Sequence, residues 1–185
     1  IIVTEPEIKK ITNLCGKQLQ RLAFTLLCLA KYWDTVNVDG DHWVNTDDSE
    51  IMRLANINTS IKRQGSLYSE LRAAGLIRFS KKIDNTNVRV NFIENGDVAM
   101  IVDDFRNLGY QCMKYMGGPY IKCEICGIVV RKSNSHSDNY HTGVGRPQKY
   151  CKDCAIAVKL RQNVESVMRR RNMLSENNLG EQRNC

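Results

Sequence analysis

The sequence predicts an α+β protein that carries a small cysteine-rich module near its C-terminal end. Three observations lead to this prediction. Apolar residues recur at helical spacing over residues 17–33 and again over residues 60–74. Over residues 77–92 the period changes to two, which is typical of paired strands. Two C-x-x-C pairs then follow between residues 123 and 154.

The composition is that of an ordinary soluble protein. Of the 185 residues, 42% are hydrophobic and 25% are charged, which argues against a disordered chain and against a membrane protein. The longest apolar run, Leu22–Ala30, is interrupted by Thr25 and is much shorter than the about 20 residues that cross a bilayer. No secretory signal pattern is visible. We therefore expect no membrane partner.

The cysteines indicate a reducing compartment. Four of the eight have the spacing of metal ligands. Cys15, Cys28 and Cys112 fall among apolar residues, where a free thiol behaves as a small hydrophobic side chain. A cytoplasmic protein, in a bacterium or a phage-infected host, fits this pattern best. Cys185 lies in a polar tail and has no predicted role.

The first third of the chain predicts two helices and a short strand. Thr4 is expected to cap a helix over Pro6–Leu14, which Gly16 ends. A stronger helical pattern over Lys17–Trp33 has one apolar side, so this helix should lie in the core. After a polar loop, His42–Val44 is predicted to form a very short strand.

Two further helices are predicted to form a helix-turn-helix. Thr46 is expected to cap the first, whose acidic first turn suits the helix dipole and which ends at Asn56. Ser60 is expected to cap the second, which runs to Ala74 and is ended by Gly75. Two short helices joined by a few residues are typical of this motif.

A hairpin should follow, because apolar and polar residues alternate over residues 77–79 and 88–92 around a turn at residues 84–87. The order helix, short strand, helix, helix, hairpin resembles the winged helix-turn-helix family over residues 17–93. The segment 71–77, Leu-Arg-Ala-Ala-Gly-Leu-Ile, is similar to the exit of that family's recognition helix into its wing. This resemblance implies a helix that enters the DNA major groove.

The charge is concentrated where this arrangement would use it. Residues 60–93 carry 7 basic and 2 acidic side chains, in a chain of net charge +7. The helix from Ser60 is expected to turn Leu67, Leu71 and Ala74 inward. Winged helices also bind proteins, and a positive face can be merely solvated. The predicted DNA contacts are Lys62, Arg63, Ser66 and Ser69 on the helix, with Lys81, Lys82 and Arg89 on the wing.

The end of the larger domain is predicted to contain a helix and a strand. Asp97–Leu108 is expected to be a helix that Gly109 ends, and Tyr110–Met116 a strand that returns to the domain. Glycines and a proline at residues 117–119 predict a linker. The first domain would then span residues 1–116.

The cysteine pairs predict one structural zinc ion. Each C-x-x-C pair can direct two thiolates at a single ion, and Cys123, Cys126, Cys151 and Cys154 would complete a tetrahedral shell with no position for water. A thioredoxin-like redox role would need a βαβ pattern, which is absent. Gly127 suits a tight knuckle, and the second pair should open a helix, so the module is expected to be treble-clef-like.

The segments 123–127 and 145–155 resemble small four-cysteine modules in phage and mobile-element proteins of Gram-positive bacteria. This resemblance implies a protein associated with nucleic acid. The module is expected to span residues 120–174, with a flexible tail over 175–185. The apolar face of its helix could pair with a second copy, forming a homodimer, or pack on the knuckle; it comprises Ile156, Leu160, Val164 and Val167. Three further DNA contacts are predicted on the helix, Arg169, Arg170 and Arg171.

Two histidines in the polar insert raise the alternative of an HNH-type nuclease. His136 and His141 lie between the cysteine pairs, as a catalytic histidine does in that class. However, no apolar framing would hold them rigidly, and no Asp-His or His-His dipeptide lies on a strand. A polar loop is the preferred interpretation.

The sequence as a whole predicts a non-enzymatic, sequence-specific protein that binds double-stranded DNA, such as a phage or bacterial transcriptional regulator. The alternative from another class is a phage-encoded interaction protein that binds a host polymerase or defence nuclease through the same scaffold.

Overall fold

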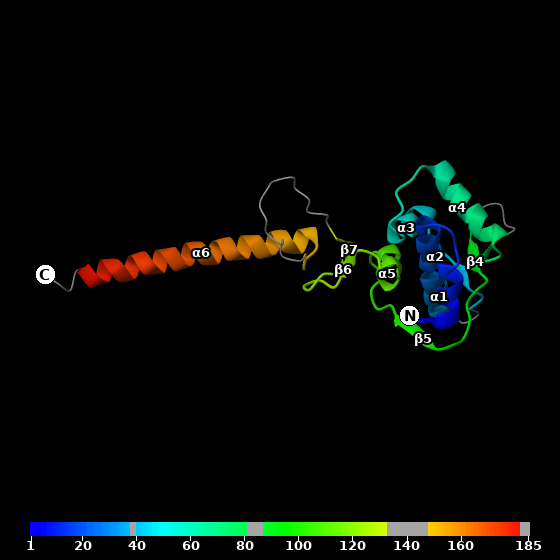
Figure 1. The fold of residues 1–185 in the computed structure, drawn as a ribbon, viewed down its shortest axis with the longest axis horizontal. Coiled ribbons are helices and arrows are strands. Elements are labelled where there is room, and N and C mark those ends of the chain that lie inside the picture. The colour runs from blue at the N-terminus through cyan, green and yellow to red at the C-terminus, as the bar shows by residue number, and fades with distance from the viewer. Residues whose placement is uncertain (38–39, 81–86, 133–147, 182–185) are drawn as a thin grey trace.

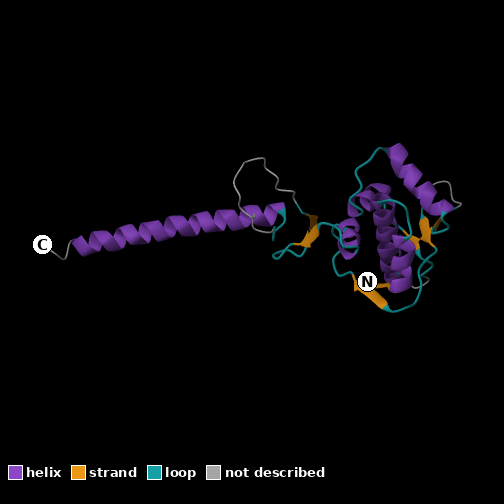
Figure 2. Cartoon of the chain, in the orientation of Figure 1, coloured by secondary structure: helices purple, strands orange, loops and turns teal. Residues whose placement is uncertain are grey.

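The computed structural model describes residues 1–37, 40–80, 87–132 and 148–181, and the predicted α+β class is confirmed (Figures 1 and 2). The helices are α1 (Glu5–Thr12), α2 (Lys17–Val36), α3 (Asp48–Leu54), α4 (Ile61–Ala73), α5 (Leu108–Tyr115) and α6 (Lys152–Glu181). The strands are β1 (Ile2–Thr4), β2 (Trp43–Val44), β3 (Ile77–Phe79), β4 (Val88–Val90), β5 (Val98–Ile101), β6 (Tyr120–Lys122) and β7 (Val129–Arg131).

Helix α2 is the centre of the larger body, as its apolar pattern predicted. Every residue from Leu22 to Ala30 is buried, because α1, α3, α4 and α5 surround this helix (Figure 1). A helix that is apolar on most of its circumference is stable only when it is enclosed in this way. None of the helices in the described ranges has both the length and the apolar character that crossing a bilayer requires.

The two predicted helices after β2 are present as α3 and α4. Ser60 caps α4 by accepting a hydrogen bond from the Arg63 backbone N–H at 3.4 Å, and Gly75 follows the helix with a φ of 72°. The cap of α3 is Asp47, one residue after the predicted Thr46. The prediction that Ala74 is buried is wrong, because α4 ends at Ala73 and Ala74 lies exposed in its C-cap; the buried face comprises Leu67, Tyr68 and Leu71.

The predicted hairpin is confirmed, and the short strand joins it. The sheet has the antiparallel order β2–β4–β3, with Trp43 opposite Arg89 and Arg78 also opposite Arg89. Ile77, Val88 and Val90 point into the core, and the arginines point outward, as the period of two requires.

Between residues 97 and 116 the predicted order of helix and strand is wrong. Strand β5 occupies Val98–Ile101 and pairs with β1, whereas residues 108–115 form α5. Gly109 does not end a helix but lies buried within α5. It packs directly on the backbone of Ala55, since a Cβ at this position would lie 2.0 Å from the Ala55 carbonyl oxygen. The glycine therefore allows α5 to approach the end of α3, which no local pattern reveals.

A buried carboxylate ties the N-terminal segment to the core. Glu7 is fully buried in α1, where it accepts hydrogen bonds from the backbone N–H groups of Thr4 at 2.8 Å and Glu94 at 3.0 Å. The Lys31 ammonium of α2 donates to it at 2.7 Å. A buried charge is tolerable when it is paired and hydrogen-bonded in this way, so Glu7 holds β1, α1 and α2 together.

Candidate functional site

The four predicted ligand cysteines lie together. Their Sγ atoms all lie within 4.8 Å of one another, and the Sγ atoms of Cys126 and Cys151 are 3.7 Å apart. Four sulfurs that surround one ion at about 2.3 Å would be about 3.8 Å from each other, whereas a disulfide requires about 2.05 Å. The geometry therefore fits a metal site and not a pair of disulfides.

Two backbone elements position these thiols. The hairpin β6–β7 carries the first pair, and its knuckle closes where the Gly127 N–H donates to the Cys123 carbonyl oxygen at 3.0 Å. Gly127 has a φ of 74°, which a glycine adopts without strain. The second pair opens α6, because Cys151 directly precedes the helix and its carbonyl oxygen accepts the Ala155 N–H at 2.9 Å.

The electrostatics of the cluster favour a bound cation. Burial of the Cys123 sulfur opposes its ionisation, but hydrogen bonds from the backbone N–H groups of residues 126, 151 and 125 lower its pKa to about 6. The pKa of Cys154 is raised to about 12 by its hydrogen bond with Cys151, together with desolvation and the other two sulfurs. Four adjacent thiolates repel one another, so a cation is needed for all of them to ionise.

This donor set could hold a metal ion, and its character limits the chemistry. Four thiolates in a tetrahedral arrangement suit zinc or iron and leave no open position for water or substrate. Cys123 and Cys151 are buried, whereas Cys126 and Cys154 are half-buried. A closed four-thiolate shell is typical of metal sites that stabilise the fold around them.

Two residues that the sequence did not single out join the cysteine module to the larger body. Arg106 Nη2 donates to the Cys126 carbonyl oxygen at 2.7 Å, while its guanidinium also pairs with Asp104. Asn107 Nδ2 donates to the Val129 carbonyl oxygen at 3.0 Å. Both were expected near the end of a helix, and no local signal indicates their contacts, because their partners lie 20 and 22 residues away.

Asn107 also contacts the turn between α3 and α4. Its Oδ1 accepts a hydrogen bond from Asn56 Nδ2 at 2.9 Å, and Asn56 in turn accepts one from Arg21 through its carbonyl oxygen. Asn107 and Asn56 have positive φ angles, of 52° and 56° respectively. Asparagine tolerates this conformation better than most residues. The helix pair and the cysteine module are thus joined through one side chain.

We expect the Asn107→Gly variant to loosen this junction. Glycine keeps the positive φ but loses two partly buried hydrogen bonds, so the free energy of unfolding should fall by about 1–3 kcal/mol. Hydrogen exchange at the β6–β7 amides should accelerate. The Asn107→Ala variant should be less stable than the glycine variant, because alanine adds the strain of the left-handed conformation. Equal stability of all three proteins would contradict the role of the side chain.

The predicted contact residues of α4 lie on its outer side. Lys62, Arg63 and Ser69 are exposed and Ser66 is half-buried. Arg63 pairs with Glu70 at 2.7 Å, and both serine hydroxyls donate to carbonyl oxygens of α4 itself. The Lys62 ammonium has no ion-pair partner among the residues that the structure describes. A Cβ at Gly65 would meet nothing within 4 Å, so this stretch of the helix is open to close approach.

The predicted wing contacts are only partly described. Lys81 and Lys82 lie outside the described residues. The Arg89 guanidinium is exposed in part and donates to the Asp41 carbonyl oxygen at 2.6 Å and to Asp41 Oδ1 at 3.0 Å. This bond holds the segment before β2 against β4.

Two other arginines, one on α4 and one on β3, are each stacked over an aromatic ring. The Arg72 guanidinium lies over the Phe79 ring at 5.8 Å, and that of Arg78 lies over the Trp43 ring at 5.7 Å. Such stacking holds a guanidinium in place while leaving its edge accessible. The alternation of residues 77–79 was a signal for Arg78, since it placed this side chain outward.

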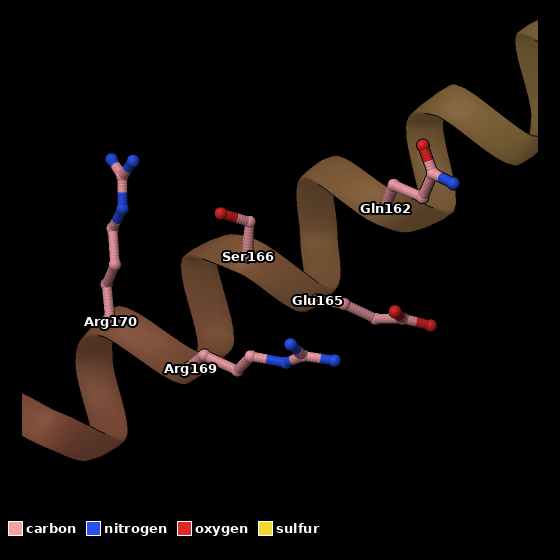
Figure 3. Close-up of a pocket in the computed structure, with 5 residues that line it drawn as sticks. All are labelled: Gln162, Glu165, Ser166, Arg169 and Arg170. Atoms are coloured by element: carbon pink, nitrogen blue, oxygen red, sulfur yellow. The ribbon is translucent and has the colours of Figure 1, made fainter. Parts of the chain in front are cut away.

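Helix α6 is longer than predicted and exposed. It runs continuously to Glu181, so there is no break at residue 174 where the tail was expected to begin. Arg169, Arg170 and Arg171 are all exposed. The apolar face does not pack on the knuckle, because Ile156 and Leu160 are 51% and 60% exposed. Glu165, Arg169 and Arg170 are among the residues that line a shallow hollow on the helix. Figure 3 shows Glu165 and Arg169 extending in the same direction and Arg170 pointing away from them.

The histidines of the polar insert, His136 and His141, fall outside the described residues. The candidate site therefore consists of the metal centre, the basic side of α4 with its flanking arginines, and α6. No protein-family model, curated protein or solved structure matches the chain.

Proposed function

We propose that the protein is a non-enzymatic, sequence-specific DNA-binding protein of the winged helix-turn-helix type, stiffened by one structural zinc ion in a treble-clef-like module. The outward side of α4 is the observation that carries this proposal. It presents Lys62 and Arg63 next to Gly65, where a ligand can approach the helix closely. A helix that offers cations and an open backbone is suited to the major groove.

The surroundings of α4 support the same function. Leu67 and Leu71 fix its inner side in the core, so the outer side is held rigidly. Arg72 lies on the last turn of α4, where its guanidinium is over the Phe79 ring of β3, and Arg78 lies on the same strand. Phosphate contacts from arginine and lysine on elements that flank a recognition helix set its register on the duplex.

Zinc is the metal that fits the four thiolates best, because an all-cysteine tetrahedral site with two C-x-x-C pairs is typical of structural zinc. Elemental analysis of the purified protein should find one zinc ion per chain. The buried free thiols of Cys28 and Cys112 suit a reducing cytoplasm, in a bacterium or a phage-infected host.

Duplex binding should weaken steeply with salt. The test is the affinity of the zinc-loaded full chain for a random-sequence duplex at about 50 mM and about 200 mM salt. Six or more phosphate contacts would reduce the affinity by about 1,000-fold over this range. Absence of binding at the lower salt concentration would contradict the proposal.

The Lys62→Ala variant should bind the duplex less tightly and with a shallower salt slope, by about one unit if Lys62 contacts a phosphate. Lys114→Ala is the matched control, because Lys114 is exposed on α5 and away from α4 (Figure 1). It should retain the affinity of the unaltered protein. If both variants lose affinity equally, the effect is one of net charge and not of α4.

One observation favours a protein partner as the second candidate. Ile61 opens α4 with 86% of its surface exposed, and Phe79 beside the helix is 36% exposed. Exposed apolar side chains at a basic surface suit a protein interface, such as that of a host polymerase or defence nuclease. In that case Ile61→Asn would abolish binding of the partner, and the duplex affinity would be low and insensitive to Lys62→Ala.

A further inference from the structure

Helix α6 projects away from the rest of the molecule (Figure 1). Its 30 residues correspond to a length of about 45 Å, yet it packs closely against none of the other described helices and strands. Helices in proteins derive most of their stability from burying an apolar face. Between residues 152 and 172 no apolar side chain of α6 is buried, so this face lacks a partner.

The exposed apolar residues of α6 include one continuous seam, and Ile156 and Met168 are exposed beside it. Leu160, Val164 and Val167 are 60%, 55% and 47% exposed. With Ala157 before them they are spaced by three, four and three residues, and the sequence continues this spacing through Arg171 and Leu174. This is the a/d pattern of a heptad repeat, whose period of 3.5 keeps one seam facing a second helix.

We propose that a second copy of this chain covers the seam, and that the two α6 helices form a parallel two-stranded coiled coil. The seam places β-branched Val164 at an a position and leucine at two of its three d positions, Leu160 and Leu174, with Val167 at the third. β-Branched residues at a with leucine at d favour two parallel strands. A twofold pair of identical helices is self-complementary, so the same residues serve both copies. The proposal does not depend on DNA binding.

Arg171 at an a position explains why the pairing would be reversible and specific in register. In a parallel dimer the two Arg171 side chains face each other, and their repulsion weakens the dimer while excluding shifted registers. In an antiparallel dimer the a positions of one helix meet the d positions of the other, so Arg171 would instead face Leu160 of the other copy in the register that pairs Val164 with Val167.

The oligomeric state of the zinc-loaded full chain, without DNA, tests the pairing. Sedimentation equilibrium from about 1 µM to about 100 µM should show a monomer–dimer equilibrium. Leu160→Asp with Val164→Asp should weaken it at least tenfold. The control, Gln162→Asp with Ser166→Asp, adds the same charge on the opposite side and should leave it unchanged. A monomeric unaltered protein throughout this range, or equal loss in both variants, would overturn the proposal.

A mixing experiment tests the orientation. Arg171→Glu chains and unaltered chains, distinguished by a mass tag, are mixed in equal amounts. Random pairing would make about one half of the dimers mixed. We expect a clearly larger mixed fraction, because in a parallel mixed dimer the introduced glutamate of one chain faces Arg171 of the other. A statistical mixture would overturn the parallel arrangement, since Arg171 would not face its own counterpart.

Discussion

The Cys123→Ser variant is expected to lose its metal and the structure of the cysteine module, while the larger body stays folded. Serine cannot supply a thiolate, and three sulfurs bind zinc far more weakly than four. The apparent free energy of zinc binding in such sites is about 10–16 kcal/mol at neutral pH, so it exceeds what a small module gains from burial.

The distribution of buried residues explains why the effect should be confined to the module. Within the described part of the module, the buried hydrophobic residues are Cys123, Val129 and Cys151. None of them belongs to the main hydrophobic cluster, which the larger body forms around α2. A module with so small a core depends on its metal for stability.

Elemental analysis and hydrogen exchange measure this outcome. Zinc should fall from one ion per chain to none, and the β6–β7 amides should lose their protection. Addition of a chelator to the unaltered protein should give the same result. The control is Cys15→Ser, because Cys15 is exposed and far from the cluster in the chain. Retained zinc, or intact protection of β6–β7 without it, would contradict the role of the metal.

The Gly109→Ala variant should strongly destabilise the larger body. The added Cβ would lie 2.0 Å from the carbonyl oxygen and 2.6 Å from the carbonyl carbon of Ala55, which is itself fully buried. Because both partners are backbone, α5 or the end of α3 must move. We expect a loss of about 3–5 kcal/mol in the free energy of unfolding.

Urea unfolding of the metal-loaded protein measures this loss, and Gly65→Ala is the matched control. Gly65 also lies within a helix, but a Cβ there meets nothing within 4 Å. Alanine at this position should stabilise the protein by about 0.5–1 kcal/mol, because it restricts the unfolded chain. If Gly109→Ala were as stable as the unaltered protein, the close approach of α5 to Ala55 would be wrong.

Local patterns predicted well where neighbouring residues decide the structure. The apolar pattern of residues 17–33, the cap at Ser60 and the glycine at residue 75 each act within one helix, and α2 and α4 are where they were expected. The alternation around residues 77–90 likewise produced the hairpin. These signals act through backbone geometry and side-chain direction, which are set within a few residues.

The same patterns failed over residues 97–116, where distant partners decide. Strand β5 exists because β1 pairs with it from the other end of the chain, with Ile2 opposite Ile101. Asp97 and Gly109 resemble the start and the end of a helix. However, β5 is determined by its pairing with β1, and Gly109 by its contact with Ala55. The sequence around residues 97–116 contains no information about either partner. Long-range pairing commonly overrides local preference in this way.

For the candidate site, the division is similar. The metal ligands follow from the spacing of two cysteine pairs, because each pair is a local backbone unit that aims both sulfurs at one point. The outward direction of Lys62 and Arg63 follows from helical periodicity. Contacts across the fold decide the rest: Asp41 restrains Arg89, Arg106 and Asn107 hold the module, and α6 keeps its apolar seam exposed. Such contacts join residues far apart in the chain, and only the folded backbone brings them within bonding distance.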